Sequence, residues 1–146
     1  AYLCVHNYYE WKPLAVGSYL ENGMCSFKNV VGDNIFMVAD VTDNGALRYL
    51  TAPFYVNPNG EVHLFIPQLD QKFSYTFDKK KRSRDYTLHY WDVDRKSFVS
   101  IPCKSSTDSM QTYEQIPENA LYWLTLPEQI VKQRVFFIEQ DTIRRY

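Results

Sequence analysis

The stretch "APFYVNPNGEVHLF", residues 52–65, has the pattern of a β-hairpin and decides the fold class of this chain. Apolar and aromatic residues flank Asn59-Gly60, a dipeptide that favours a type I′ turn with positive φ at both central residues. The stretch "QRVFFIEQDTIRRY", residues 133–146, repeats this order of strand, polar turn and strand. The sequence therefore predicts two similar hairpins, one in each half of the chain.

Short strand-like runs continue this pattern along the whole chain, and Gly, Pro and Asn separate them. No long stripe of apolar residues at helical spacing is found, and the one helical alternative is a single turn within 126–135. The predicted strands are 2–6, 12–16, 24–28, 35–39, 47–50, 54–56, 62–66, 73–77, 86–91, 98–101, 110–114, 120–125, 134–139 and 142–146. Many short strands at this spacing predict an all-β antiparallel β-sandwich with little or no helix.

Internal repetition indicates how these strands are grouped. The aligned segments, in chain order, are 2–7 with 86–91, 11–14 with 98–101, 24–27 with 110–113, 34–39 with 120–125, 54–56 with 136–138, and Val62 with Ile143. The offset stays between 81 and 87 residues. We therefore expect a first β unit at 1–67, a connecting segment at 68–84 and a second, similar β unit at 85–146. The alternative is that two strand-turn-strand sequences match by chance.

Composition argues against two classes of partner. The chain of 146 residues has a net charge of -1, so we expect no general attraction to nucleic acid or to an anionic membrane. No apolar run reaches the roughly 20 residues that cross a bilayer, so no membrane insertion is expected. The basic run at 79–84 could bind phosphate or nucleic acid, but Asp78 and Asp85 flank it and no further basic stripe extends it. A solvated linker between the units is the favoured interpretation.

Three cysteines, Cys4, Cys25 and Cys103, stand far apart and do not follow the spacing of a zinc site. Each has apolar or small neighbours in a strand-like segment, which favours buried free thiols. A Cys4–Cys25 disulfide and a catalytic thiol are the alternatives. A nucleophilic cysteine is usually activated at a helix N-terminus or beside a cation, and the sequence predicts no such helix.

Catalytic and metal-binding constellations are weak in this sequence. Cys103, His89 and Asp92 can be combined into a triad, but such triples arise by chance in most chains, and a strand histidine is more often packed or exposed than a base. Asp92 and Asp94 could bind Ca²⁺, yet such a site needs about six or more oxygen ligands, and a hairpin turn explains both residues. We therefore predict no catalytic residue, no metal ligand and no cofactor.

Aromatic clusters are the strongest binding feature, since aromatic residues make up 16% of the chain. Planar rings on a sheet can stack on sugar rings, but aromatic side chains are also the usual filling of a small β core. Adjacent residues of a strand point to opposite faces, so only one ring of Tyr90-Trp91 or Tyr122-Trp123 can join a given core. The candidate ligand-binding residues are Tyr8, Tyr9, Trp11 and Trp91, with Tyr8 or Tyr9 as the expected exposed ring.

The segments "YLCVHNYYEWKPLAVG", "SFKNV" and "TAPFYVNPNGEVHLFIP", within 1–67, resemble the β-rich region that follows the catalytic core in transglutaminase-like proteins of gut-dwelling bacteria. The region 85–146 is more loosely similar to the companion unit that often closes such proteins. The resemblance implies a paired β-sandwich appendage of an exported, cell-envelope protein. Nothing in this sequence matches the catalytic Cys, His and Asp of that family, so a catalytic domain of the parent protein would lie outside this chain.

The chain begins with Ala1 inside a strand-like pattern, so we expect a processed product or a piece of a longer chain. The leading hypothesis is a non-catalytic accessory or interaction module of a larger protein, which the resemblance places in the periplasm or at the cell surface. Its expected partners are a glycan, another protein, or the catalytic domain of the same parent chain. A carbohydrate-binding module with exposed aromatic rings is the alternative, and a small-ligand barrel or an enzyme is a weaker hypothesis.

Overall fold

The computed structural model describes residues 1–70, 73–78, 85–126 and 134–146. These residues form the strands β1 to β16 and no helix, which confirms the predicted all-β antiparallel fold. The chain divides into two compact units, unit 1 (Ala1–Phe65) and unit 2 (Ile66–Tyr146). The basic run at 79–84 and most of the predicted helical turn lie outside the described residues.

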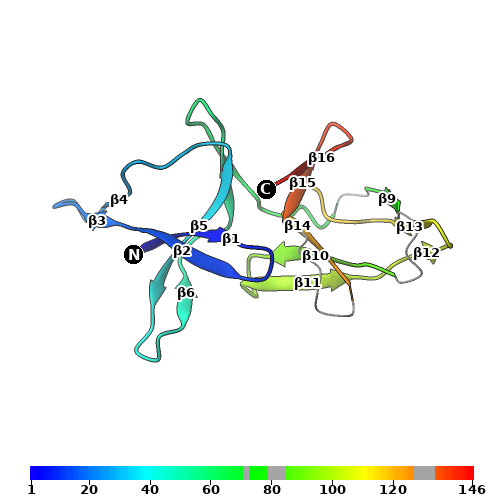
Figure 1. Cartoon of the computed structure of the whole chain (residues 1–146), viewed down its shortest axis with the longest axis horizontal. Coiled ribbons are helices and arrows are strands. Elements are labelled where there is room, and N and C mark those ends of the chain that lie inside the picture. The colour runs from blue at the N-terminus through cyan, green and yellow to red at the C-terminus, as the bar shows by residue number, and fades with distance from the viewer. Residues whose placement is uncertain (71–72, 79–84, 127–133) are drawn as a thin grey trace. The chain divides into compact units, whose positions relative to one another are not determined.

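Unit 1 is built on one six-stranded antiparallel sheet with the order β2-β1-β5-β7-β8, in which β6 also pairs with β5 (Figure 1). β3 and β4 form a separate two-stranded hairpin. The strands are β1 (Tyr2–His6), β2 (Trp11–Val16), β3 (Ser18–Tyr19), β4 (Cys25–Ser26), β5 (Asn34–Val41), β6 (Leu47–Tyr49), β7 (Phe54–Val56) and β8 (Val62–Leu64). β5 is the central strand, and it buries three consecutive side chains, Ile35, Phe36 and Met37.

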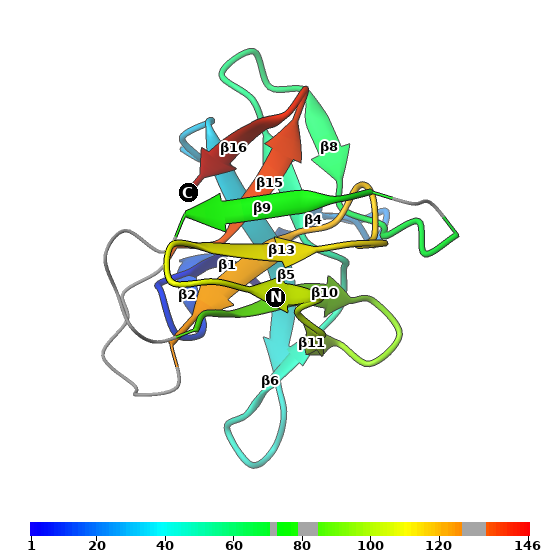
Figure 2. The same ribbon diagram turned by 90° about the vertical axis from the view of Figure 1, so that its right-hand side faces the viewer.

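Unit 2 contains a five-stranded sheet with the order β11-β10-β14-β15-β16 and a three-stranded sheet with the order β12-β13-β9, whose strands β9 and β13 lie side by side in Figure 2. The strands are β9 (Tyr75–Asp78), β10 (Thr87–Asp92), β11 (Ser97–Ile101), β12 (Ser105–Ser106), β13 (Met110–Tyr113), β14 (Tyr122–Thr125), β15 (Phe136–Glu139) and β16 (Thr142–Arg145). β9 falls within 68–84, so part of the expected connecting segment is an element of unit 2.

Aromatic side chains hold the two sheets of unit 2 together. Phe77 of β9 makes edge-to-face contacts with Tyr113 of β13 and Phe136 of β15, with ring centroids 5.9 and 5.8 Å apart. Leu88 of β10 and Tyr122 of β14 are buried in the same cluster. Full burial of one large apolar side chain contributes about 1.5–3 kcal/mol, so this cluster fixes the three-stranded sheet on the five-stranded sheet.

The five-stranded sheet of unit 2 and the main sheet of unit 1 share one strand order. The strand order is β11-β10-β14-β15-β16 in unit 2 and β2-β1-β5-β7-β8 in unit 1, and neighbouring strands in each order form antiparallel pairs. Residues that the sequence alignment matches also have matching cross-strand partners. Phe36 pairs with Phe54 in unit 1, and the aligned Tyr122 pairs with Phe136 in unit 2. In the same way, Val56 pairs with Val62, and the aligned Ile138 pairs with Ile143. A duplication would produce this agreement, and the duplication itself stays a prediction.

The first strand of the repeat departs from the predicted alignment by one residue. Val5 pairs with Phe36, whereas Tyr90 pairs with Tyr122, so Val5 corresponds to Tyr90 and not to His89. A shift of one residue moves every side chain of a strand to the opposite face. The sequence pattern did not reveal the β-bulge between β1 and β2, which β10 and β11 lack.

Three glycine-containing turns of unit 1 share a geometry that differs from the predicted type I′ turn. Positive φ occurs at the glycine alone, with +81° at Gly23, +80° at Gly45 and +85° at Gly60, and the glycine N–H donates to the carbonyl three residues earlier. This is the pattern of a type I turn followed by a glycine bulge. The expectation of positive φ at both central residues was therefore wrong here, and it is met instead at Gln140 and Asp141, between β15 and β16.

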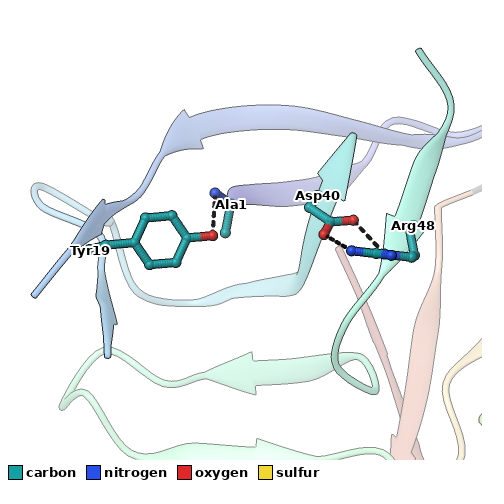
Figure 3. A network of polar contacts seen from close by, with 4 residues as sticks. All are labelled: Ala1, Tyr19, Asp40 and Arg48. Atoms are coloured by element: carbon teal, nitrogen blue, oxygen red, sulfur yellow. Dashed lines mark hydrogen bonds and ion pairs between the residues drawn. The ribbon is translucent and has the colours of Figure 1, made fainter. Parts of the chain in front are cut away.

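Polar contacts orient the strands around the start of unit 1 (Figure 3). Arg48 of β6 donates from Nε to Oδ1 of Asp40 on β5 at 2.9 Å, and a second bond joins the same two side chains. This hydrogen bonding and the guanidinium charge lower the pKa of Asp40. The amino group of Ala1 contacts the hydroxyl of Tyr19 on β3 at 3.1 Å. Exposed pairs add little to stability, so these contacts mainly set the orientation of β6 and β3.

Gly17 lets the β3–β4 hairpin fold closely against the chain that leaves β2. Its N–H donates to the carbonyl of Ala1 at 2.8 Å. A Cβ at this position would lie 2.3 Å from Sγ of Cys25 and 2.9 Å from the ring of Phe27. Both distances are shorter than van der Waals contact, so any side chain at position 17 would move the hairpin.

One buried amide organises the polar interior of unit 2. Gln111 is fully buried, its Oε1 accepts from the N–H of Tyr86 at 2.7 Å, and its Nε2 donates to the carbonyl of Tyr86 at 2.9 Å. The hydroxyl of Tyr113 donates to the same carbonyl at 2.9 Å, and burial raises the pKa of Tyr113. These bonds tie β13 to the residue that precedes β10.

Replacing Gln111 with Ala should destabilise unit 2 strongly. The variant removes the partner of two buried backbone groups and opens a cavity, at a cost of roughly 2–4 kcal/mol in the free energy of unfolding. Urea unfolding followed by circular dichroism measures the change. The matched control is Gln68→Ala at an exposed position, which should stay within about 0.5 kcal/mol of the original chain. Equal losses in the two variants would contradict the role given to the Gln111 amide.

Candidate functional site

Tyr8 and Tyr9 occupy the tight loop between β1 and β2. The N–H of Asn7 donates to the carbonyl of Glu10 at 2.9 Å, and Oδ1 of Asn7 accepts from the N–H of Glu10 at 3.2 Å, so the two tyrosines are the central residues. Tyr8 has a φ of +82°, which is uncommon for a bulky residue. Tyr8 is half-buried and Tyr9 is 49% exposed. Tyr9 is therefore the ring of this pair that faces solvent.

Trp11 and Trp91 are core residues, although the sequence placed both among the candidate ligand-binding residues. Their exposed fractions are 4% and 3%. Each makes an edge-to-face contact with its cross-strand partner, Trp11 with His6 at 5.3 Å and Trp91 with Phe98 at 5.1 Å between ring centroids. At this burial neither indole offers a face on which a ligand could stack.

A second group of rings lies on the five-stranded sheet of unit 2. The ring of Trp123 is 5.2 Å from that of Phe98 and 5.6 Å from that of His89, between centroids, and all three residues are half-buried. His89 Nε2 lies 2.9 Å from the hydroxyl of Thr125, and burial lowers the pKa of His89. Sequence reasoning did not include Phe98 or Trp123 among the site residues. The alternation of strand faces, which separates Trp123 from Tyr122, was the signal that could have found Trp123.

The three cysteines are free thiols in different environments. Cys4 on β1 is fully buried, which raises the pKa of its thiol, and Cys25 on β4 is half-buried. The structure therefore contains no Cys4–Cys25 disulfide, which the sequence had left as an alternative. Cys103 is exposed and its Sγ contacts the carbonyl of Ser105 at 3.2 Å. The predicted burial of Cys103 within a strand was wrong, because β11 ends before Pro102, which has no N–H for the ladder.

The residues of the hypothetical triad are engaged in local contacts. His89 contacts Thr125, and Oδ1 of Asp92 accepts from the N–H groups of Asp94 and Arg95 at 2.9 and 3.1 Å. Asp92 thus stabilises the turn between β10 and β11, as expected from the hairpin interpretation. In the part of the chain that the structure describes, no group of three or more His, Cys, Asp or Glu residues is placed to hold a metal ion.

Exposed large apolar side chains concentrate on unit 1. Five of them follow one another along β2, β3 and the following turn, and we call this set the β2–β3 surface; it consists of Leu14 (60% exposed), Val16 (71%), Tyr19 (67%), Leu20 (49%) and Met24 (61%). On the opposite edge strand, β8, Val62 and Leu64 are also exposed. In unit 2, the described residues of this kind are Ile66, Leu69 and Met110. Grouped apolar side chains in contact with water are a common mark of an interaction surface.

No family model, curated protein or solved structure matches this chain. The resemblance to transglutaminase-like proteins therefore stays a prediction from the sequence. The described residues include no helix long and apolar enough to cross a membrane.

The free energy of unfolding should fall as the pH drops from about 6.5 to about 4, because His6 is buried in its neutral form. Burial lowers the pKa of His6 from 6.5 to about 4. The unfolded chain therefore binds this proton first, so the stabilisation is fully present above pH 6.5 and is lost as the pH falls toward 4. The loss amounts to at most about 3 kcal/mol.

Urea unfolding of the original chain and of His6→Phe across this pH range measures the effect. His6→Phe keeps a ring beside Trp11 and should lose the part of the pH slope that His6 contributes, while His89, whose pKa burial also lowers, keeps its own part. His63→Phe, at an exposed position on β8, is the control and should keep the slope. If the slope of His6→Phe equals that of the original chain, His6 is not a source of the pH dependence.

Alkylation of the folded chain should modify Cys103 first, Cys25 more slowly and Cys4 only after unfolding, because thiol reactivity follows exposure. Mass spectrometry of peptides after timed pulses of iodoacetamide gives the three rates. In denaturant without reductant, all three thiols should react. A Cys4–Cys25 pair that reacts only after a reductant is added would show a disulfide and contradict this assignment.

Proposed function

We propose that this chain is a non-catalytic β module that binds a partner protein through unit 1, as an accessory part of a larger exported protein. The observation that carries the proposal is the β2–β3 surface, where five large side chains are about half or more exposed. The parent protein and its export rest on the sequence resemblance alone. The partner takes the form either of another protein or of the catalytic domain of the same parent chain.

The surroundings of this surface favour contact through side chains. Burial of a Leu or Val side chain contributes about 1.5–3 kcal/mol, so an occupant that covers Leu14 and Val16 gains a substantial share of a typical binding free energy. β2 is an edge strand, but it contains Pro13 and a β-bulge opposite Leu3 and Cys4. Proline and bulges protect an edge from pairing with a further strand. The β2 edge is thus suited to side-chain packing more than to strand addition.

A carbohydrate-binding module is the second candidate function. The exposed ring of Tyr9 and the half-buried rings of Phe98 and Trp123 favour it, since such rings can stack on a sugar. The burial of Trp11 and Trp91 weighs against it. Protein binding is therefore the better supported function.

Selection of random phage-displayed peptides on the immobilised full chain tests protein binding. We expect enriched apolar peptides whose affinity falls about tenfold or more in the double variant Leu14→Ser/Val16→Ser, since about 1.4 kcal/mol corresponds to a factor of ten. The matched control is Val41→Ser/Leu50→Ser, which changes two exposed residues of unit 1 outside the β2–β3 surface. This control should bind the same peptides with unchanged affinity.

Two results would count against this function. Peptides that bind both double variants equally well would show that the β2–β3 surface is not used. Glycan-array binding that is lost in Tyr9→Ala and retained in Leu14→Ser/Val16→Ser would support the carbohydrate-binding module in its place.

A further inference from the structure

Strand β9 completes the core of unit 2. It pairs with β13, with Phe77 opposite Gln111 and Tyr75 opposite Tyr113. The ring of Phe77 contacts the rings of Tyr113 and Phe136, which belong to the two different sheets. Tyr113 and Phe136 are 1% and 0% exposed. One side chain of β9 therefore helps to close both sheets.

The β3–β4 hairpin of unit 1 corresponds to β12–β13 of unit 2. The pairs are Ser18 with Ser26 and Tyr19 with Cys25 in unit 1, and Ser105 with Thr112 and Ser106 with Gln111 in unit 2. These registers agree with the alignment of 24–27 with 110–113, which rests on the sequence alone. β4 is thus the counterpart of β13, Cys25 that of Gln111, and Phe27 that of Tyr113.

Unit 1 has no strand in the place of β9. All residues of Ala1–Phe65 are described, and within them β4 pairs with β3 alone. The counterparts of Tyr113 and Phe136 are Phe27 and Phe54, and both of these rings are half-buried where their counterparts are fully buried. Both rings of unit 1 therefore keep some exposed surface, whereas their counterparts in unit 2 have almost none.

The free edge of β4 presents backbone groups for pairing. The carbonyl of Met24 accepts from the N–H of Leu20 at 2.7 Å and so points toward the strand of β3, while the N–H of Met24 donates to Oδ1 of Asn22 at 3.0 Å. Backbone groups of successive strand residues point to alternate sides, so those of Cys25 point away from β3. In unit 2, the equivalent residue Gln111 faces Phe77 of β9. Cys25 thus presents its N–H and C=O where unit 2 receives a strand.

We propose that unit 1 accepts an extended segment of a partner protein as an added strand along the free edge of β4. The segment carries aromatic side chains at alternate positions, as Tyr75 and Phe77 do in β9, and one of these rings packs against Phe27 and Phe54. Main-chain hydrogen bonds supply affinity in such strand addition, and the alternate side chains supply specificity. The inference deepens the proposed function and rests on it, because it names the form of the protein partner.

A synthetic peptide that contains β9 and the two residues before it, FSYTFD (residues 73–78), flanked by lysines for solubility, is the probe for the full chain. Amide hydrogen exchange measured by NMR shows where it binds. At saturating peptide, exchange of the Cys25 amide should slow at least about tenfold, because that N–H becomes hydrogen-bonded. The Ser26 amide, which already faces β3, should change little and serves as an internal control.

Two further comparisons separate strand addition from loose apolar contact. A peptide that is N-methylated at the position of Phe77 keeps every side chain but loses one ladder donor, so it should bind about tenfold more weakly. The protein variant Phe27→Ala should weaken binding about as much, whereas Tyr90→Ala, which removes a half-buried ring of unit 2, should not. The methylated peptide needs no change in the protein, so its result holds even where Phe27→Ala does not fold.

The possible failures are distinguishable. Protection at β2, at β8 or at Gln111 in place of Cys25 would overturn strand addition at β4, as would equal binding of the methylated peptide. Protection of Cys25 that rises with protein concentration without peptide would identify a second copy as the occupant and overturn a partner strand. If phage-selected peptides need Leu14 and Val16 while FSYTFD leaves Cys25 unprotected, the proposed function stands and this inference fails.

Discussion

A β-sheet with an apolar face is stable in water only when a second layer covers that face. In unit 2 this layer is a three-stranded sheet, and Phe77 joins it to the larger sheet through Tyr113 and Phe136. In unit 1 the strands outside the main sheet are those of the hairpin of β3 and β4. Phe27 and Phe54 of unit 1, which the sequence alignment matches with Tyr113 and Phe136, are half-buried.

The two units also differ in how they satisfy polar groups beside this layer. Gln111 binds the N–H and the carbonyl of Tyr86, which gives unit 2 a buried polar link between β13 and the start of β10. Cys25 is the residue of unit 1 that the sequence alignment matches with Gln111, and a thiol cannot form the same pair of bonds. A buried, fully bonded amide favours one fixed arrangement. Unit 2 therefore has a buried polar link beside this layer, and most of the exposed large apolar side chains belong to unit 1.

The strands were predictable because their residues combine aromatic and β-branched side chains with clear glycine and proline boundaries. β3 and β12 were missed, since two residues such as Ser105 and Ser106 carry no periodic pattern. Turn type was mistaken at Asn59-Gly60, where one extra loop residue turns a type I′ pattern into a glycine bulge. The burial of Trp11 and Trp91 was not predictable either, because strand alternation gives two faces and does not say which one is covered. The open edge of β4 could be recognised only by comparing the strand pairing within unit 1 with the strand pairing within unit 2.

The close packing at Gly17 restricts how this chain can vary. Because Sγ of Cys25 and the ring of Phe27 fill the space where a side chain would stand, a larger residue at position 17 is compatible with the fold only if position 25 or 27 becomes smaller. The three positions therefore form one coupled set, and related sequences should change them together. Covariation among these positions would then mark chains that keep the same spacing between the hairpin and the main sheet.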